Sequence, residues 1–214
     1  IFEQIQGFSE YGFPESHAAS FALLVYASCW IKRHEPAAFL VALLNSQPMG
    51  FYTPSQLVQD ARRHGVEVRP VDVMHSRVES TLEDLPDTPA VRLGLHMVGG
   101  LQASSAQRIV AERHKAPFDS AEELARRARL EQHEMKLLAA AGALAWLSGH
   151  RRQQVWDAAA LHAPPALLHD APLDEDYLEL PAAPEGEEVV WDFASVGLSL
   201  RSHPMALLRP RLDR

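Results

Sequence analysis

Two adjacent glycines followed by small polar residues form the part of this sequence best suited to bind a phosphate. They lie in the segment Gly94–Val110, which reads GLHMVGGLQASSAQRIV. Glycines permit a tight turn, and the first N–H groups of the helix behind the turn have no partner within that helix. The helix dipole makes such N–H groups attractive to anions. This chemistry holds a nucleic-acid backbone and reads no base sequence.

The spacing fits a helix-hairpin-helix pattern: a short helix, a glycine hairpin, and a second helix starting near Ser104. Gln102 stands where the pattern has its second glycine. A side chain at a position that needs positive φ costs about 1 kcal/mol, so a distorted hairpin with weaker DNA contact is expected. An ordinary helix–turn–helix corner is the alternative interpretation. The residues predicted to contact phosphate are Gly99, Gly100, Leu101, Gln102, Ser104 and Ser105, flanked by Arg108 and Arg113.

Charge is distributed unevenly along the chain. The net charge is −8, which argues against nucleic-acid binding over the whole protein surface. Residues 90–153, however, contain 10 Lys and Arg against 6 Asp and Glu, a balance of +4. The predicted hairpin therefore lies in the one basic segment, as steering toward phosphate requires.

The elements around the hairpin are predicted to be mainly helical, with a few short strands. Apolar periodicity, caps and glycine stops predict these elements. Helices are expected at 17–33 (capped by Ser16), 36–44 (with Pro36 in the first turn), 54–64 (with a capping box from Thr53 to Gln56), 121–128 (capped by Ser120) and 131–141. Strands are expected at 66–73 and 90–93, a loop at 74–89, and a degenerate second hairpin at 142–160. In that second hairpin, Arg151 and Arg152 are expected either to contact DNA or to lie on the solvated surface. Arg126, Arg127 and Arg129 are expected to form a solvated helix face.

Other chemistries lack their motifs. The sequence has no HExxH, CxxC, GxxxxGK[ST] or GxSxG spacing, so neither a metal site nor a catalytic residue is predicted. The single cysteine, Cys29, lies in an apolar segment and is expected to be a small core residue. The longest apolar run, residues 21–31, is too short to span a bilayer. No membrane partner is expected, and the chain has the character of an intracellular fragment.

Several long segments carry a more specific signal. They are YGFPESHAASFALLVYASCW, NSQPMGFY, VRLGLHMVGGLQASSAQRIVAER and GLSLRSHPMALLRPRL. Over essentially the whole chain they resemble C-family bacterial DNA polymerases. The first two segments are closer to the error-prone, damage-inducible paralogue, because the replicative enzymes more usually carry Lys at the position of Glu15.

The resemblance implies a domain order. Residues 1–73 would be the C-terminal part of a fingers domain, residues 74–162 a tandem helix-hairpin-helix DNA-binding domain, and residues 163–214 an acidic linker toward an OB-fold domain. Ser16 and His17 would lie on the side of the incoming nucleotide and template. The palm carboxylates that hold two Mg²⁺ ions in the family have no match here, so no cofactor and no activity are expected of this fragment alone.

The implied function is that of an error-prone DNA-directed DNA polymerase active in translesion synthesis in the bacterial cytoplasm. The partners would be a primer–template duplex, a deoxynucleotide in the parent enzyme, and accessory proteins of a mutagenesis complex. Two other classes stay open: a stand-alone DNA-binding module, and a scaffold that recruits partners through its acidic C-terminal part. The apolar helix at 17–33 argues against the stand-alone module, which would not need so much buried surface.

Overall fold

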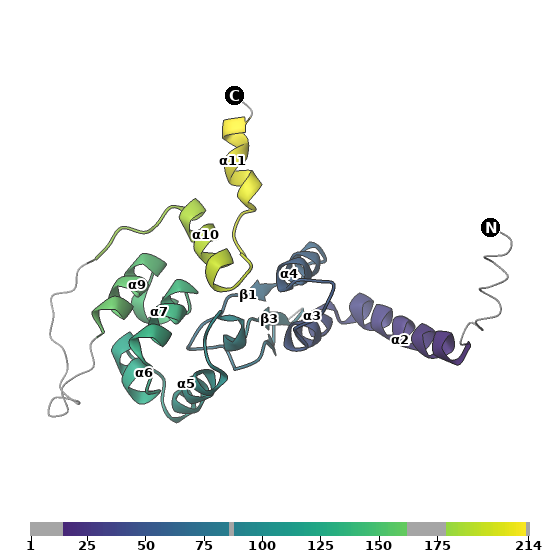
Figure 1. Ribbon diagram of the computed structural model, residues 1–214, viewed down its shortest axis with the longest axis horizontal. Helices are drawn as coiled ribbons and strands as arrows, with labels where there is room; N and C mark the ends of the chain where they lie inside the picture. Colours follow the sequence, from purple (N-terminus) through teal and green to yellow (C-terminus); the bar gives the residue numbers. More distant parts are fainter. Residues whose placement is uncertain (1–14, 86–87, 162–178, 213–214) are drawn as a thin grey trace.

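The computed structural model describes residues 15–85, 88–161 and 179–212 (Figure 1). This part of the chain is mainly helical with one small sheet, which confirms the predicted fold class. The helices are α2 (Glu15–His34), α3 (Pro36–Asn45), α4 (Pro54–Arg63), the 3₁₀ turn η1 (Leu95–Met97), α5 (Ala103–Lys115), α6 (Ala121–Arg127), α7 (Gln132–Ala140), α8 (Ala145–Ser148), α9 (Arg151–Ala160), α10 (Glu185–Ser195) and α11 (Pro204–Leu212).

Local signals set the ends of α3 and α4. Pro36 occupies the first turn of α3, where its missing N–H is not needed. At α4 the Thr53 side chain accepts from the Gln56 N–H, and the Gln56 side chain accepts from the Thr53 N–H. This reciprocal pair is the predicted capping box. Both helix starts are therefore confirmed.

The sheet contains β1 (Val68–Arg69), β2 (Thr81–Glu83) and β3 (Ala90–Arg92) in the order β1-β3-β2. β1 runs parallel and β2 antiparallel to β3, with Val68 and Leu82 both opposite Val91. The prediction of a plain loop at 74–89 was therefore wrong. It missed β2 because charged and polar residues dominate the segment, and pairing with β3 supplies what local propensity lacks.

One carboxylate connects all three strands. Glu83 accepts hydrogen bonds from Arg92 Nε on β3 and Arg69 Nη1 on β1, each at 2.7 Å. The Arg92 guanidinium, followed by that of Arg69, holds the pKa of Glu83 below its usual value of 4.5. The ionised form of Glu83 is thus favoured in the folded protein.

Glu83→Gln is expected to lower the free energy of unfolding by about 1 kcal/mol at pH 7, because charge-assisted bonds to two arginines become neutral ones. Since the folded pKa of Glu83 is lowered, its contribution is complete above the unfolded value near 4.5 and is lost as the pH falls through the folded pKa. Urea titrations of both proteins at several pH values measure this. A wild-type advantage that persists unchanged at low pH would contradict the assignment.

The long helix α2 extends away from the body of the molecule (Figure 1). Its apolar side chains are exposed, Leu23 at 70% and Tyr26 at 73% among them, and Cys29 is exposed as well. The predictions of a buried helix and a core cysteine were therefore wrong for this chain: among the described residues α2 contacts α3 and reaches α4 through the Lys32–Asp60 ion pair, and its apolar side chains stay exposed. Across the described residues no helix, α2 included, is long and apolar enough to cross a membrane.

The core runs without interruption from α3 to the C-terminal segment. Its largest fully buried side chains include Leu44, Val73, Val91, Leu93, Leu95, Ile109, Leu124, Met135, Leu138 and Leu144. β1 precedes the predicted domain boundary at residue 73 and β3 follows it, so the sheet joins the two predicted domains. The domain division itself stays a prediction.

The C-terminal part of the predicted linker is folded. From Glu185 the chain forms α10, which packs against α7, and Val189 and Leu198 are buried. The description of residues 163–214 as a linker was therefore wrong from Glu185 onward. The acidic first turn of α10 concealed the apolar residues that follow, and acidic residues are themselves favourable at a helix N-terminus.

Candidate nucleic-acid interface

The first hairpin has the predicted layout of a short helix, a turn and a longer helix. η1 is followed by the turn Val98–Leu101, in which the Leu101 N–H donates to the Val98 carbonyl at 3.2 Å. Gly100 has φ +83°, a left-handed conformation that favours glycine. Gln102 is the residue that precedes α5. Thus the glycine that makes the turn is Gly100, and the helix starts one residue before Ser104.

Four N–H groups at this turn are available to a ligand. Within the described ranges the N–H groups of Gly100, Gln102, Ala103 and Ser104 have no hydrogen-bond acceptor. All four residues are exposed. N–H groups that converge on the solvent at the start of a 13-residue helix form a site suited to one phosphate group.

Gln102 fits the hairpin without strain. Its φ is −70° and its ψ is 141°, an extended conformation that any residue adopts. The expectation that Gln102 would distort the hairpin was therefore wrong. The pattern's second glycine is dispensable here because the chain has already reversed at Gly100, and the position before a helix takes extended backbone.

Gly99 differs from its neighbours because its N–H is already used. It donates to the carbonyl of Ser195 at the end of α10, at 2.8 Å. A Cβ at Gly99 would lie 3.0 Å from the same carbonyl oxygen, so α10 approaches the hairpin as closely as backbone allows. Gly99 therefore serves the contact with α10 in this structure, and Leu101 packs against the core.

Two predicted contacts of α5 face the protein interior. Ser105 is buried, its hydroxyl donates to the Glu134 carboxylate, and its N–H donates to the Gln102 carbonyl. Arg108 donates from Nε to the Ala128 carbonyl at 2.7 Å and from Nη2 to Ser105 Oγ at 3.1 Å. These groups join α5 to α6 and α7. The Ser105 N–H is therefore not free for a phosphate, whereas contact of Arg108 with DNA stays a prediction.

Arg113 is also engaged within the protein. Its Nη1 donates to the Val73 carbonyl at 2.5 Å, which joins α5 to the segment after β1. Burial lowers the pKa of Arg113, and the nearby Arg77 charge adds to this effect. In this structure the Arg113 side chain binds the segment after β1, and its predicted place beside the DNA backbone stays a prediction.

The second hairpin follows the predicted layout of α8, a turn at Gly149 and α9, but Arg151 does not lie where it was predicted. Arg151 is only 7% exposed and donates to the Glu188 carbonyl at 2.9 Å and to the Asp192 carboxylate at 2.5 Å, both on α10. Arg152 pairs with Glu187 at 3.0 Å. Both expectations for Arg151, DNA contact or free surface, were therefore wrong: acidic residues some forty positions away bury it.

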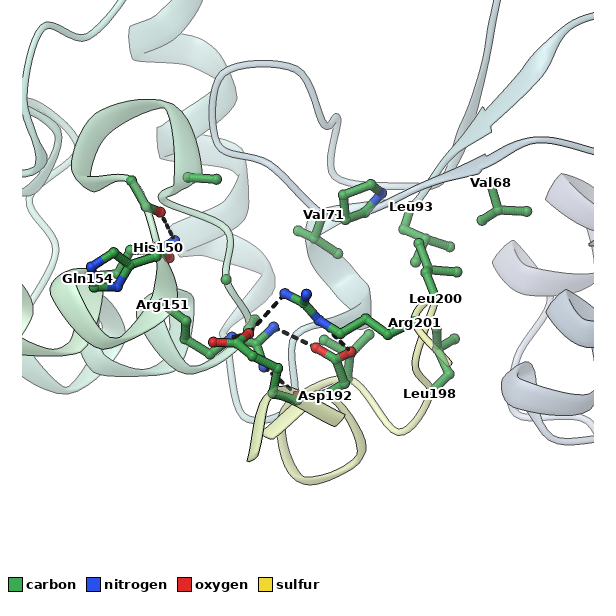
Figure 2. A pocket seen from close by; sticks show the side chains of 17 residues that line it. Val68, Val71, Leu93, His150, Arg151, Gln154, Asp192, Leu198, Leu200 and Arg201 are labelled. Carbon is green, nitrogen blue, oxygen red and sulfur yellow. Dashed lines mark hydrogen bonds and ion pairs between the residues drawn. The ribbon is translucent and has the colours of Figure 1, made fainter. Parts of the chain in front are cut away.

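This ion-pair cluster lies at a groove of about 520 Å³ between the sheet, the second hairpin and the C-terminal segment (Figure 2). Arg201 completes the cluster, with Nη2 at 2.8 Å from Glu188 Oε2 and Nε at 3.6 Å from Asp192 Oδ2. Sequence reasoning missed both acids. A signal existed, since residues four positions apart on a helix lie on one face and can share a partner.

Elsewhere, the remaining predictions concern α2 and α6. Ser16 lies inside α2, which begins at Glu15, so it does not precede the helix as expected. His17 is exposed and its ring stacks against Phe21 with centroids 4.3 Å apart. A nucleotide-side role of Ser16 and His17 stays a prediction. On α6, Arg127 is not solvated, because it donates to the Glu112 and Ala116 carbonyls at 2.5 and 2.8 Å.

Comparison with known proteins agrees with this geometry. The family profile of the helix-hairpin-helix motif matches residues 65–154, which contain the sheet, the first hairpin and the second hairpin as far as the first turn of α9. The match therefore covers the candidate interface and the elements that position it.

The whole chain is similar to part of a group of longer proteins, each named error-prone DNA polymerase. The relatives include those of Azoarcus sp. (58% identical, 99% of this chain, 20% of the relative), Burkholderia pseudomallei (57%, 100% and 20%) and Methylococcus capsulatus (51%, 100% and 22%). The chain thus spans about a fifth of the length of these relatives.

Proposed function

We infer, from the similarity of the whole chain to error-prone DNA polymerases, that it is a segment of such an enzyme and that its first hairpin holds duplex DNA by a phosphate. The observation that carries the proposal is the group of free N–H groups at Gly100, Gln102, Ala103 and Ser104. Their location at a helix start gives a positive potential where a phosphate oxygen would lie. Binding of this kind positions duplex DNA without regard to its sequence.

For the parent enzyme we propose template-directed nucleotidyl transfer past damaged bases in the bacterial cytoplasm. Its partners are a primer–template duplex, a deoxynucleotide and accessory proteins of a mutagenesis complex. Two Mg²⁺ ions would supply the electrostatic stabilisation of nucleotidyl transfer. Among the residues that the structure describes, no group of three His, Cys, Asp or Glu side chains is placed to hold a metal ion. Ser16 and His17 retain their proposed place on the nucleotide side.

The test of the hairpin uses the 214-residue chain and a labelled primer–template duplex over a salt series. Ser104→Glu places a negative charge at the proposed phosphate and is expected to weaken binding about fivefold, with a smaller salt slope, because one phosphate contact is lost. The helix itself tolerates this change, since an acidic residue in its first turn is favourable. Fluorescence anisotropy gives both quantities.

Gln107→Glu is the matched control, because Gln107 is exposed one turn further along α5 and the substitution adds the same charge. It is expected to keep nearly wild-type affinity. If both variants bind alike, the effect is one of net charge and the hairpin does not hold a phosphate. If the wild type binds no duplex at all, the DNA-holding role is lost and recruitment of partner proteins becomes the better interpretation.

A further inference from the structure

An exposed tryptophan contacts a loop that also carries or binds two arginines. Trp146, on α8, is 71% exposed, and its ring meets the edge of His75 with centroids 5.8 Å apart. The loop that carries His75 is fixed beside α8, because the Val73 N–H donates to the Ala143 carbonyl at 2.9 Å. The tryptophan is therefore held in place at the surface rather than covered.

Two arginines lie on or against the loop that carries His75. Arg113 Nη1 is anchored to the Val73 carbonyl at 2.5 Å, which places its guanidinium at the base of the same loop. Arg77 is exposed, lies close enough to contribute to the lowered pKa of Arg113, and forms neither a hydrogen bond nor an ion pair through its side chain with any described residue. We call Trp146, His75, Arg77 and Arg113 the Trp146 patch.

The carboxylate closest to these cations offers little compensation at the surface. Asp72 is 6% exposed and its Oδ1 accepts from the Met74 N–H at 2.7 Å. Burial raises the pKa of Asp72, while the hydrogen bond from Met74 and the charges of His75, Arg92 and Arg113 act in the opposite direction. The Trp146 patch therefore presents to the solvent an aromatic face and, at Arg77, a positive charge without an ion-pair partner among the described residues.

We propose that the Trp146 patch binds single-stranded nucleic acid, with one base stacked on Trp146 and the adjacent phosphates near Arg77 and Arg113. Aromatic rings beside a cationic track are the usual means of holding a strand without reading its sequence, because every base has a face that can stack. A protein partner would more often require a wider apolar surface, whereas here a single ring lies against a loop that carries or binds two arginines.

The Trp146 patch could bind a strand that continues from a duplex held at the hairpin. The proposal does not depend on duplex binding at the hairpin. Ser104 and Arg113 lie at opposite ends of α5, roughly 14 Å apart along the helix axis at 1.5 Å per residue. That separation corresponds to roughly four nucleotides of one strand. A strand that leaves a duplex held at the hairpin would thus reach Arg113 within a few nucleotides.

The test measures the affinity of the 214-residue chain for a labelled single-stranded thymidine 12-mer. Trp146→Ala is expected to weaken binding about tenfold, through loss of one stacked base. Trp156→Ala is the matched control, since Trp156 is 51% exposed on α9 outside the Trp146 patch. Arg77→Glu is expected to lower the affinity for the 12-mer and to reduce the salt dependence of binding. Arg62 is an exposed arginine of α4, and Arg62→Glu is expected to change neither quantity.

Two outcomes would overturn the proposal. Equal affinity of Trp146→Ala and Trp156→Ala would exclude stacking on Trp146 and favour a protein contact there. Loss of single-strand binding in Ser104→Glu, with the Trp146 variant intact, would assign the strand to the hairpin instead. Duplex affinity measured in parallel separates the two sites, because Trp146→Ala is expected to leave it unchanged. Circular dichroism melts verify that each variant folds.

Discussion

Arg151→Met is expected to lower the free energy of unfolding by about 3 kcal/mol and to loosen α10 from the second hairpin. The substitution keeps most of the apolar volume but removes the charge that pairs with Glu188 and Asp192. Both acids are nearly buried, at 6% and 8% exposed, and removal of one partner of a buried ion pair leaves an uncompensated charge. Arg201 retains contact with both acids, which limits the loss.

Arg152→Met is the control for this prediction. It is the neighbouring residue, its side chain is 36% exposed, and its ion pair with Glu187 lies at the surface, where such pairs contribute about 0–1 kcal/mol. Chemical denaturation of both variants gives the comparison, and hydrogen exchange of the α10 amides locates the effect. Similar losses in the two variants would show that the buried cluster contributes no more than a surface pair.

Gly94→Ala is expected to be at least as disruptive, with a loss of about 3 kcal/mol. A Cβ at Gly94 would lie 2.3 Å from the Glu79 carbonyl carbon and 2.5 Å from the Ser80 nitrogen, both backbone atoms. Backbone atoms cannot move aside as a flexible side chain does. The segment before β2 and the end of β3 must therefore move apart to make room for the Cβ. The Gly94 N–H would then also lose its acceptor, Ser80 Oγ at 3.1 Å.

Gly50→Ala serves as the reference substitution, because no atom lies within 4 Å of the position of its Cβ and its φ is not in the left-handed region. It is expected to change stability by less than about 0.5 kcal/mol. Thermal unfolding followed by circular dichroism measures both variants. A Gly94→Ala protein as stable as Gly50→Ala would mean that the two backbone segments separate at negligible cost.

Features whose cause is local were predictable from the sequence. The capping box at Thr53, the first-turn proline of α3 and the serine cap of α6 each depend on residues within a few positions, and each has its expected geometry. The hairpin turn belongs to the same class, since Gly100 supplies the left-handed conformation by itself. Local chemistry therefore predicts the layout of the candidate site.

Side-chain roles were not predictable in the same way, because they depend on distant partners. Arg108, Arg113 and Arg151 all read as surface cations in a basic segment, yet each donates to groups 20 or more residues away. A count of charges does not distinguish an arginine that binds phosphate from one that donates hydrogen bonds to backbone carbonyls within the protein. The exposed face of α2 shows a second limit of sequence-based prediction. Its apolar composition indicates that the helix should be buried, but not which surface would cover it.

The hydrogen bond from the Gly99 N–H to the Ser195 carbonyl couples the free energy of unfolding to the free energy of phosphate binding. A phosphate that took the Gly99 N–H as a further donor would have to displace the Ser195 carbonyl, which would then need another partner. The Gly99 N–H can donate either to the Ser195 carbonyl or to a phosphate. Tighter packing of α10 against the hairpin therefore opposes phosphate binding by this group. Substitutions that shift the end of α10 are therefore expected to trade unfolding free energy for DNA affinity, even though they touch no DNA.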